Sequence, residues 1–542
     1  MAKKWRMIKM KRYNKKWTVL GMLIMSLALV LAGCGGSNAA VTKEKTNKDE
    51  LVIYIGYGMT SGGYDPCTGY GIYGDGIFHS NLLKFNAQIE AEPDLAVGYT
   101  VSDDGLTYTY TLRDDVKFSD GEPLTADDVA FTYMTAKASG SSVDLTMLEK
   151  AEAKDKVTVV FTLNKKWSAF ASTTALLGIV PEHAYGPGYG DNPIGTGPFK
   201  VAQLDKEQQL IVVPNDYYYG TKPAFKKITI LNLDEEAALA AAKSGNLDVV
   251  MVNPEYAYEE VPGMSMARIK TVDNRGFNLP VIGETKDGKG NVIGNNVTSD
   301  YAVRKALNIG IDRETIIQNA LNGIGTPAYG RVDALPWNNT PEFEDGRVEE
   351  AKALLAEAGW IDTDGDGIRE KNGIKAEFKI SGRTDDLQRY NLAVALSEDA
   401  KKLGINLIAE ALAWADCKAL TRTIPTCWGS GDYNPIDLYN AHYSQMIGVG
   451  TSNPASYANP KVDDYIEKAL AATSMAEAID YWKLSQWDGE TGTSVDYPFL
   501  WIVNIDHTYF VRDGLSLGEQ RIHPHGHGVP VIANLNEWTF ES

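Results

Sequence analysis

Signatures of enzymes and of nucleotide-binding proteins are missing from this sequence. It contains no GxxxxGK[ST] phosphate-binding loop, no HExxH zinc motif and no GxSxG nucleophile motif. ATP hydrolysis through a P-loop is therefore excluded. An extracellular hydrolase is disfavoured, because it would need an organised nucleophile or a catalytic metal. We expect a protein that is not an enzyme and holds no cofactor.

Basic residues are also few in comparison with acidic ones. The chain has 52 Lys and Arg against 71 Asp and Glu. Eight of these cations and none of the acids lie in residues 1–33, so the remainder carries a formal charge of about −27. Nucleic acid is excluded as a partner, because phosphate binding depends on clustered cations. The length predicts roughly three domains with an ample core.

The one long apolar run lies at the N-terminus, over residues 17–31, after the basic stretch MAKKWRMIKMKRYNKK. It is short for a transmembrane helix, which needs ~20 apolar residues, and is typical of an export signal. The following LAGC resembles a bacterial lipobox, which implies cleavage before Cys34 and a diacylglycerol on its thiol. We expect a signal peptide over 1–33, a lipid anchor at Cys34 and a flexible tether over 34–48.

Only three cysteines follow Cys34, namely Cys67, Cys417 and Cys427. Export implies an oxidising compartment, which permits disulfides. Cys417 and Cys427 are separated by nine residues, KALTRTIPT, so a disulfide between them and two free thiols are both compatible with the sequence. We expect Cys67 to be unpaired and buried.

Strand and helix patterns alternate along the rest of the chain, without a tandem repeat or a long low-complexity linker. The expected strands are 51–57, 107–112, 157–163, 226–231 and 247–252. Residues 346–360 place apolar side chains on one helical stripe that ends at Gly359. A second helix is expected between Asp312, as N-cap, and Gly323. The pattern predicts an α/β protein with closely associated domains.

Four longer stretches are distinctive. They are residues 103–132, residues 193–201 with the NDYYYGTKPAFKKITI segment after them, residues 301–328, and residues 349–373. Together and in this order they resemble the dipeptide/oligopeptide/nickel-binding family, family 5, of bacterial ABC-importer substrate-binding proteins. The resemblance covers nearly all of the chain beyond the tether. It implies a noncatalytic receptor that serves a membrane permease powered by a separate ATPase.

The same resemblance implies a two-lobed, type II periplasmic-binding-protein-like fold with an extra subdomain inserted in lobe I. Lobe I would comprise 49–88, 186–276 and 505–542, the insertion 89–185, and lobe II 277–504. The chain would cross between the lobes near 275–281 and 500–506. Two crossing strands make a hinge, and closure of the lobes would bury the solute.

The segment CWGSGDYNPIDLYNAHYS, residues 427–444, matches the place where family members line the ligand pocket. Its Asp432 matches the aspartate that pairs with the α-ammonium group in peptide-binding members. A carboxylate in a closed cleft is costly unless paired, so it favours a ligand with a positive amine. The alternative is that Asp432 caps a Gly-rich turn. Trp428 and Tyr433 are the aromatic candidates beside it, although Trp428 is equally compatible with a core or hinge position.

A metal chelate is the alternative ligand. Nickel-binding members use aromatic residues at the positions of Trp428 and Tyr433, and His442 lies near their histidine ligand. They also clamp the chelator with an arginine before the segment that matches IVPEHAY, and STTALLG at 172–178 has none. The resemblance therefore favours a short peptide, with nickel or a related chelate as the alternative.

His523, His525 and His527 alternate in the run RIHPHGHG, residues 521–528. In an extended segment alternate side chains share a face, so three imidazoles could converge on nickel or zinc. Two glycines and a proline argue against a regular strand, and the position after the second crossing favours a place outside the cleft. A loop with structural histidines is the preferred interpretation, while a surface metal site and a pocket metal site stay open.

Two further runs imitate known motifs. DTDGDGIREKNG, residues 362–373, begins like an EF-hand loop but has Gly373 where a bidentate Glu is needed, which favours an Asp/Gly hairpin turn. GYGIYG, residues 69–74, matches GxGxxG without a preceding strand or a following helix. In the family the neighbouring region borders the ligand, so Tyr64 and Tyr70 are pocket candidates by resemblance.

These observations converge on one expectation. We expect a monomeric lipoprotein on the outer face of the cell membrane, facing a periplasm or the outside of a single-membrane cell. It would capture short peptides by lobe closure and deliver them to the permease subunits of an ABC importer.

Overall fold

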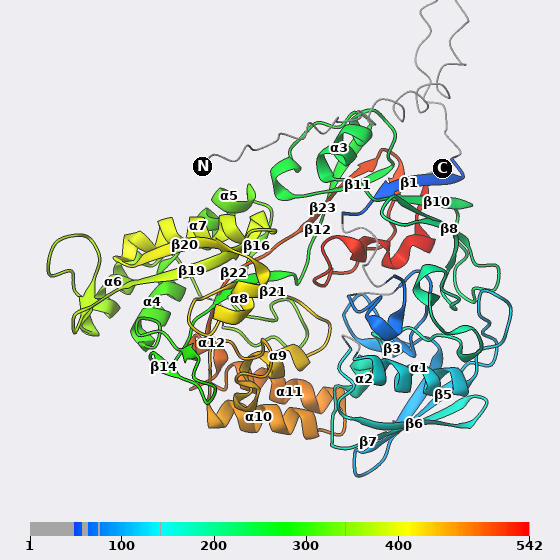
Figure 1. The fold of residues 1–542 in the computed structure, drawn as a ribbon, viewed down its shortest axis with the longest axis horizontal. Coiled ribbons are helices and arrows are strands. Elements are labelled where there is room, and N and C mark those ends of the chain that lie inside the picture. The colour runs from blue at the N-terminus through cyan, green and yellow to red at the C-terminus, as the bar shows by residue number, and fades with distance from the viewer. Residues whose placement is uncertain (1–47, 57–62, 74–75, 141–142, 342, 541–542) are drawn as a thin grey trace, which may run out of the picture. The chain divides into compact units, whose positions relative to one another are not determined.

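The computed structural model describes residues 48–56, 63–73, 76–140, 143–341 and 343–540 (Figure 1). The expected signal peptide, Cys34 and the tether up to residue 47 lie outside the described residues. Residues 48–542 form one unit by themselves. None of the helices in the described ranges has the length and apolar character needed to cross a bilayer.

A mixed sheet of seven strands has the order β12-β23-β11-β1-β10-β9-β8. Its strands are β1 (Glu50–Tyr54), β8 (Phe199–Asp205), β9 (Gln209–Pro214), β10 (Lys227–Leu231), β11 (Val249–Val252), β12 (Met264–Ile269) and β23 (His507–Arg512). Strand β1 is parallel to β10 and β11, and the other neighbours are antiparallel. Helix α3 (Glu235–Lys243) contacts β11 and begins at the N-cap Asp234, which accepts a 2.8 Å hydrogen bond from the Ala237 amide.

A second, antiparallel sheet is built from the segment between β1 and β8. Its order is β4 (Ala96–Val101), β5 (Thr107–Leu112), β7 (Thr158–Leu163) and β6 (Leu148–Asp155). Helix α1 (Ala126–Ser139) packs on β6 and β7 and starts with a capping box formed by Thr125 and Asp128. The alternation expected for 107–112 is present, because Tyr108, Tyr110 and Leu112 are buried. The short elements β2 (Leu83–Phe85), β3 (Ala91–Pro93) and α2 (Phe170–Thr173) complete this region.

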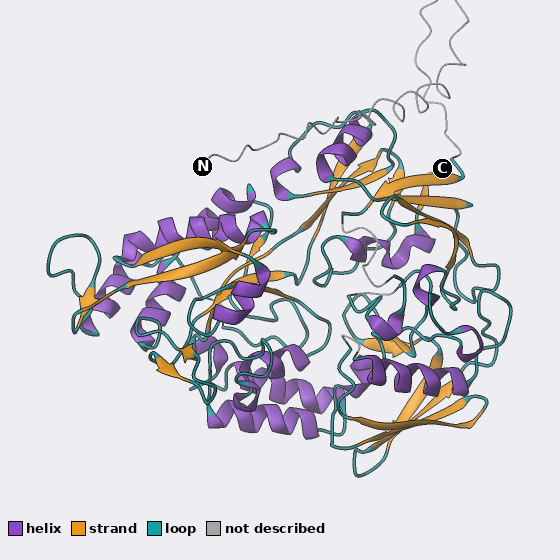
Figure 2. Cartoon of the chain, viewed as in Figure 1, coloured by secondary structure: helices purple, strands orange, loops and turns teal. Residues whose placement is uncertain are grey.

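A third group of elements follows β12. Its four-stranded sheet has the order β16 (Thr326–Pro327), β22 (Phe499–Asn504), β13 (Asn274–Asn278) and β21 (Cys427–Ser430), and β19 (Glu377–Arg383) pairs in parallel with β20 (Asn406–Leu412). Its helices, drawn in purple in Figure 2, are α4 (Tyr301–Gly310), α5 (Arg313–Leu321), α6 (Val348–Glu357), α7 (Leu387–Ala400), α8 (Trp414–Leu420), α9 (Ile436–His442), α10 (Pro460–Ala471), α11 (Met475–Gln486) and α12 (Thr493–Asp496). Short hairpins are formed by β14 (Thr285–Lys286) with β15 (Val292–Ile293) and by β17 (Glu370–Lys371) with β18 (Ile374–Lys375), and β24 (Leu515–Ser516) pairs with β25 (Thr539–Phe540).

Two capping predictions in this group are confirmed, at the start of α5 and after the end of α6, whereas α5 ends at Leu321 with Asn322, one residue before the expected Gly323, as its left-handed C-cap. Asp312 accepts a 3.0 Å hydrogen bond from the Thr315 amide at the start of α5. Helix α6 buries Ala351 and Leu355 and is followed by Gly359, whose φ of +89° is the left-handed conformation that glycine adopts without steric cost.

Two strand pairs carry the chain between the seven-stranded and the four-stranded sheet (Figure 1). Strand β12 leads into β13, and β22 leads into β23. Strands β13 and β22 are antiparallel neighbours, and the Ile505 amide donates to the Asp273 carbonyl at 2.9 Å just outside them. The expected crossings near 275–281 and 500–506 overlap these two strands.

The inserted sheet and the third group also touch each other directly. The Ser168 hydroxyl donates to the Ala469 carbonyl at 2.7 Å, and the rings of Trp167 and Tyr439 lie 5.5 Å apart. One hydrophobic core contains residues of α1 and β7 together with Trp482 of α11.

The cysteines require a correction. Cys417 and Cys427 are both free and buried, so the disulfide that their spacing allowed is not formed. The Cys417 thiol points at the Gly382 carbonyl, 3.6 Å away, and burial raises the pKa of the Cys427 thiol to about 12. Cys67 is free and buried, as expected.

Candidate functional site

A cavity of about 390 Å³ lies where β19, β21 and α9 meet the run at 521–528. Its volume falls in the usual range of small-molecule sites, about 300–1,000 Å³. Carboxylates and guanidinium groups face it together. These residues are Asp432, Asp437, Arg331, Arg383 and Arg389. A ligand that fits this wall carries charges of both signs.

Asp432 is the charged group of the cavity without a protein partner. No hydrogen bond or ion pair joins its carboxylate to any residue in the described ranges, and it caps no helix, since α9 has Pro435 at its N-cap position. Its neighbour Asp437, by contrast, accepts from Arg331 at 2.7 Å through both oxygens and from Ser430 at 2.7 Å. Arg331 is therefore paired with Asp437, and the carboxylate of Asp432 is available to a ligand.

Burial and the negative charge of Asp437 raise the pKa of Asp432 to about 7, although Arg331 acts in the opposite direction. A group with this pKa exchanges a proton near neutral pH. A cation that approaches it favours the anion and lowers this pKa. The turn-cap alternative has no support in these contacts.

The backbone before Asp432 is held against the crossing strand. Gly431 has a φ of +142°, and a Cβ atom there would lie 2.1 Å from the Val272 carbonyl oxygen. Its own carbonyl accepts a 2.8 Å hydrogen bond from the His525 amide. Only glycine allows this close approach, which fixes the position of the following carboxylate.

Two arginines of the wall are oriented by acids outside it. Arg383 donates to Asp385 from Nε at 2.8 Å and from Nη2 at 2.7 Å, and its guanidinium lies 4.6 Å from the ring centre of Trp414. Arg389 forms a 2.8 Å ion pair with Asp386. Because a guanidinium has five N–H donors, Arg383 keeps donors on Nη1 for a ligand carboxylate.

Of the two aromatic candidates in the segment 427–444, only Trp428 lines the cavity. Its indole N–H donates to Asn278 and Thr421, at 3.1 Å in each case, and its ring meets Trp414 edge to face at 5.2 Å. Tyr433 is buried elsewhere, with its hydroxyl on the Ile522 carbonyl and its ring 5.3 Å from Phe85. Adjacent residues of an extended segment point to opposite sides, and Trp428 and Tyr433 are separated by a tight turn.

Tyr64 and Tyr70 pack in the core instead of the cavity. The two rings meet edge to face at 5.2 Å, and both contact Phe78. The aromatic residue of this region that does line the cavity is Tyr73, which sequence reasoning missed although it belongs to the same GYGIYG run. Its ring lies 5.4 Å from that of His525 and is 40% exposed.

His442 is buried at the end of α9 and does not line the 390 Å³ cavity. It borders a smaller neighbouring cavity with Arg331 and Phe499. Burial and the charge of Arg331 hold its pKa well below the usual value, so the imidazole is neutral. Its Nδ1 has no hydrogen-bond partner among the described residues.

The three histidines of residues 521–528 do not converge on one point. His523 is buried in the hinge, with Nδ1 3.1 Å from Nδ1 of His507 and Nε2 3.0 Å from Gln520. His525 and His527 turn the other way and line the cavity, with ring centres 4.6 Å apart. The expectation that this run lies outside the cleft is therefore wrong. It follows the second crossing but folds back between the lobes, through the His525 contact with Gly431.

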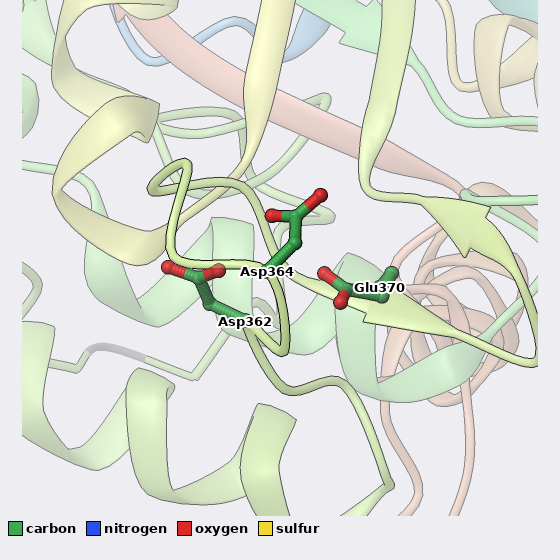
Figure 3. A group of neighbouring side chains, drawn as sticks. All are labelled: Asp362, Asp364 and Glu370. Carbon is green, nitrogen blue, oxygen red and sulfur yellow. The ribbon is translucent and has the colours of Figure 1, made fainter.

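Among the described residues, the only three ligand atoms close enough to share a metal ion are carboxylate oxygens of Asp362, Asp364 and Glu370, shown in Figure 3. Asp362 and Asp364 lie on the exposed loop before β17, and Glu370 is the first residue of that strand. The Lys375 ammonium binds Asp364 at 3.1 Å and also Asp366, and thereby offsets part of the negative charge of the loop. Asp362 accepts from the amides of Gly365 and Gly367 at 2.7 and 3.0 Å. These contacts are those of the preferred Asp/Gly turn.

Comparison with known proteins assigns this architecture to a family. Residues 90–462 match the profile described as "Bacterial extracellular solute-binding proteins, family 5 Middle". The chain is 32% identical to Protein XP55 of Streptomyces lividans over 507 residues. The aligned region covers 90% of each of the two chains. It is 29% identical over 577 residues to the oligopeptide-binding protein AppA of Bacillus subtilis, covering 97% of this chain and 99% of AppA.

A similar fold is seen in solved structures. The structure of NikZ from Campylobacter jejuni in complex with Ni(L-His) superposes with a TM-score of 0.73 at 24% identity, over 91% of this chain and 99% of NikZ. At this level of identity the likeness shows the fold, a two-lobed α/β substrate-binding architecture.

Proposed function

Because the chain belongs to the family 5 bacterial extracellular solute-binding proteins, we propose that it captures short peptides and holds their α-ammonium group with Asp432. The members of this family are extracytoplasmic substrate-binding proteins of ABC importers and not enzymes. They bind ligands such as peptides or nickel chelates. The choice between these ligand classes rests on the wall of the cavity.

The observation that carries the peptide proposal is the unpaired carboxylate of Asp432 in a cavity that also contains arginines. A free peptide has an ammonium group at one end and a carboxylate at the other. The ammonium group supplies the positive charge that Asp432 lacks, and guanidinium donors of Arg383 are available to the carboxylate. Trp428, Trp414 and Tyr73 offer apolar faces for side chains between the two ends.

Ligand capture in this scheme is a shift of population. A ligand that touches both lobes stabilises the closed form, and the permease distinguishes it from the open form. We propose lobe I as residues 49–88, 186–276 and 505–542, the insertion as 89–185 and lobe II as 277–504. These bounds keep the seven-stranded sheet and the inserted sheet each within one part and place one lobe boundary inside β13. We further propose a monomer held at the membrane by a lipid on Cys34. The mass of the N-terminal peptide of the exported protein tests the anchor, and an unmodified Cys34 would contradict it.

A nickel or related chelate is the second candidate. His525 and His527 favour it, because their rings lie at the cavity wall beside Trp428. The pKa of His527 is lowered to about 3, mainly by burial, so its imidazole is neutral, which is the form that ligates metals. His442, the candidate suggested by resemblance, does not line this cavity.

Calorimetry with three ligands separates the two candidates. Ala-Ala-Ala, N-acetyl-Ala-Ala-Ala and Ni(II) with L-histidine are titrated into the protein at pH 8. We expect the free tripeptide to bind, and acetylation to weaken binding at least 100-fold because it removes the ammonium charge. Binding of the nickel complex alone, with neither tripeptide detected, would replace the peptide proposal with the chelate.

The pKa of Asp432 predicts a pH dependence of peptide affinity. The folded protein has a pKa of about 7 at this carboxyl, above the ordinary 3.8, so the ligand-free protein is protonated there below pH 7. An ammonium ligand requires the anion, and binding must therefore expel a proton at low pH. We expect the affinity for Ala-Ala-Ala to fall by up to tenfold per pH unit below pH 7 and to be flat between pH 7 and 8.

Titration at four values between pH 5 and 8, in buffers with different ionisation enthalpies, measures both the affinity and the released proton. If the affinity of the Asp432→Asn variant showed the same dependence on pH below pH 7, that dependence would belong to another titrating group. The free energy of unfolding depends on pH in the opposite sense from the peptide affinity. Because the pKa of Asp432 is higher in the folded protein than in the unfolded chain, this residue makes the ligand-free protein less stable as the pH rises from about 4 to 7.

A further inference from the structure

A second, smaller cavity adjoins the main one. It has a volume of about 200 Å³ and shares His527 with the larger cavity. Its wall comes from both proposed lobes, with Met251, Asn253 and Arg275 from lobe I and Gln388 from lobe II. The inference drawn from it rests on the proposed capture of peptides, and concerns which side chains of a peptide are accepted.

Asp506 gives this cavity an unsatisfied acceptor. Its side chain is fully buried, and its Oδ2 binds Arg268 and, at 3.1 Å, the Lys270 ammonium. Its Oδ1 is buried without a hydrogen-bond partner among the described residues. Leaving a buried carboxylate oxygen unpaired is costly, so this atom selects for a donor from a ligand.

His507 lies beside Asp506 on the cavity wall, and its neighbours orient its ring. Gln520 donates its amide N–H groups to the Leu517 carbonyl and to Asn534, so its Oε1 accepts from Nε2 of His523. Burial lowers the pKa of His523 well below the usual value, which makes it neutral, with a bare Nδ1.

Nδ1 of His507 must then be the donor in its 3.1 Å contact with Nδ1 of His523. Nε2 of His507 lies 3.5 Å from an oxygen of Asp273, and this contact contributes to the lowered pKa of Asp273. His507 and Asp273 therefore occupy each other, and Oδ1 of Asp506 is the acceptor left for a ligand.

The remaining wall suits a charged group on an apolar stem. Glu235 adds a further carboxylate, held by both nitrogens of Asn253, and its pKa is raised by burial. Met251, Val252 and Ile505 supply apolar surface. Among the described residues of the wall the one permanent cation is Arg275, which is paired with Asp273. The cavity also has more room than the five heavy atoms of a lysine side chain require.

We propose that this cavity is a side-chain subsite that accepts a lysine or arginine of the bound peptide. The cationic group donates to Oδ1 of Asp506, and its methylene groups lie against Met251 and Ile505. Peptides with a basic residue at the position that reaches past His527 are therefore preferred ligands.

Position scanning of a tripeptide tests the subsite. Affinities are measured by calorimetry for Lys-Ala-Ala, Ala-Lys-Ala and Ala-Ala-Lys, and for the three peptides in which norleucine, a neutral residue of similar shape, replaces lysine. We expect one lysine peptide to bind at least tenfold more tightly than its norleucine counterpart, since hydrogen bonds to charged groups are worth more than neutral ones.

The variant Asp506→Asn then assigns the preference to this cavity. The amide oxygen can keep the contact with Arg268 while its NH₂ group faces the cavity, which turns an acceptor into a donor. The lysine preference should fall to less than threefold, with the norleucine affinity unchanged. Asp480→Asn, on the exposed face of α11, makes the same change of charge and should retain the preference.

The outcomes separate two failures. Equal binding of lysine and norleucine peptides at all three positions would overturn the subsite and leave peptide capture intact. A lysine preference that survives in Asp506→Asn would also overturn it. Absence of binding by all six peptides would overturn both the subsite and the proposed function.

Discussion

Replacing Asp432 with asparagine is expected to weaken the binding of Ala-Ala-Ala at pH 8 by roughly 100-fold or more. The carboxylate has no protein partner in the described residues, so the ammonium group of the ligand is its counter-charge. Loss of one member of a buried charge pair typically costs about 2–5 kcal/mol of binding free energy, because the other charge stays desolvated. Calorimetry on the purified variant measures the loss directly.

The same variant should fold at least as well as the parent protein. In the absence of ligand the raised pKa of Asp432 shows that its negative charge is unfavourable, and asparagine removes that charge without changing the size of the side chain. The ligand-free melting temperature should therefore stay the same or rise. A variant that melts normally and binds Ala-Ala-Ala within threefold of the parent would eliminate Asp432 as the ammonium partner. Asp480→Asn serves as the matched control for charge.

The largest loss of stability is expected for Arg313→Met. Arg313 is fully buried at the start of α5, where Nε donates to the carbonyls of Ala328 and Trp501 at 2.9 and 2.8 Å, and Nη1 binds Asp345 at 2.9 Å. Methionine removes these donors and leaves buried carbonyls and a carboxylate unpaired. Breaking a buried ion pair from one side costs about 3–5 kcal/mol, which should appear as a lower urea midpoint.

A matched control separates burial from charge. Lys468→Met removes one cation from an exposed i,i+4 pair with Asp464, whose N–O distance is 2.7 Å. Exposed pairs of this kind contribute less than about 1 kcal/mol. If both variants lost the same small amount of unfolding free energy, the network around Arg313 would not be the brace between α5 and β22 that its contacts describe.

Local features of the fold could be predicted from the sequence because their causes are local. The alternation of Tyr108, Tyr110 and Leu112 sets a buried face on β5, and Asp312 caps α5 through a contact three residues away. The glycine at 359 ends a helical turn by its own backbone conformation. Each of these needs only a few neighbouring residues and no knowledge of the tertiary structure.

The candidate site was predictable only in part, because it is assembled from distant segments. Asp432 was found by the resemblance of its segment to a family motif, and it lines the cavity. No pattern in the sequence showed that Arg331 is occupied by Asp437, 106 residues away. Tyr433 and Tyr70 face cores instead of the cavity, since the direction of a side chain in an irregular segment depends on tertiary contacts.

The histidine run 521–528 illustrates the same limit. Its residues are close in sequence, yet His523 bonds to His507 and His525 bonds to Asp273, at 2.5 Å, from opposite sides of one segment. A motif interpretation assumes that neighbouring ligands share a target. The proline and glycines of the run remove the regular geometry on which that assumption depends.

The backbone of this run has a mechanical consequence. The His523 amide donates to the Lys270 carbonyl at 2.9 Å, and the His523 carbonyl accepts from the Val272 amide at 2.8 Å. The run therefore pairs with the first crossing segment and forms a short third segment of the hinge. A hinge of two strands bends freely about the axis that runs between the strands. A third segment that lies beside this axis resists bending in one direction. We expect the lobes to open by a rotation of small amplitude in one preferred direction. The imidazole rings of His525 and His527 should move with the edge of the cleft.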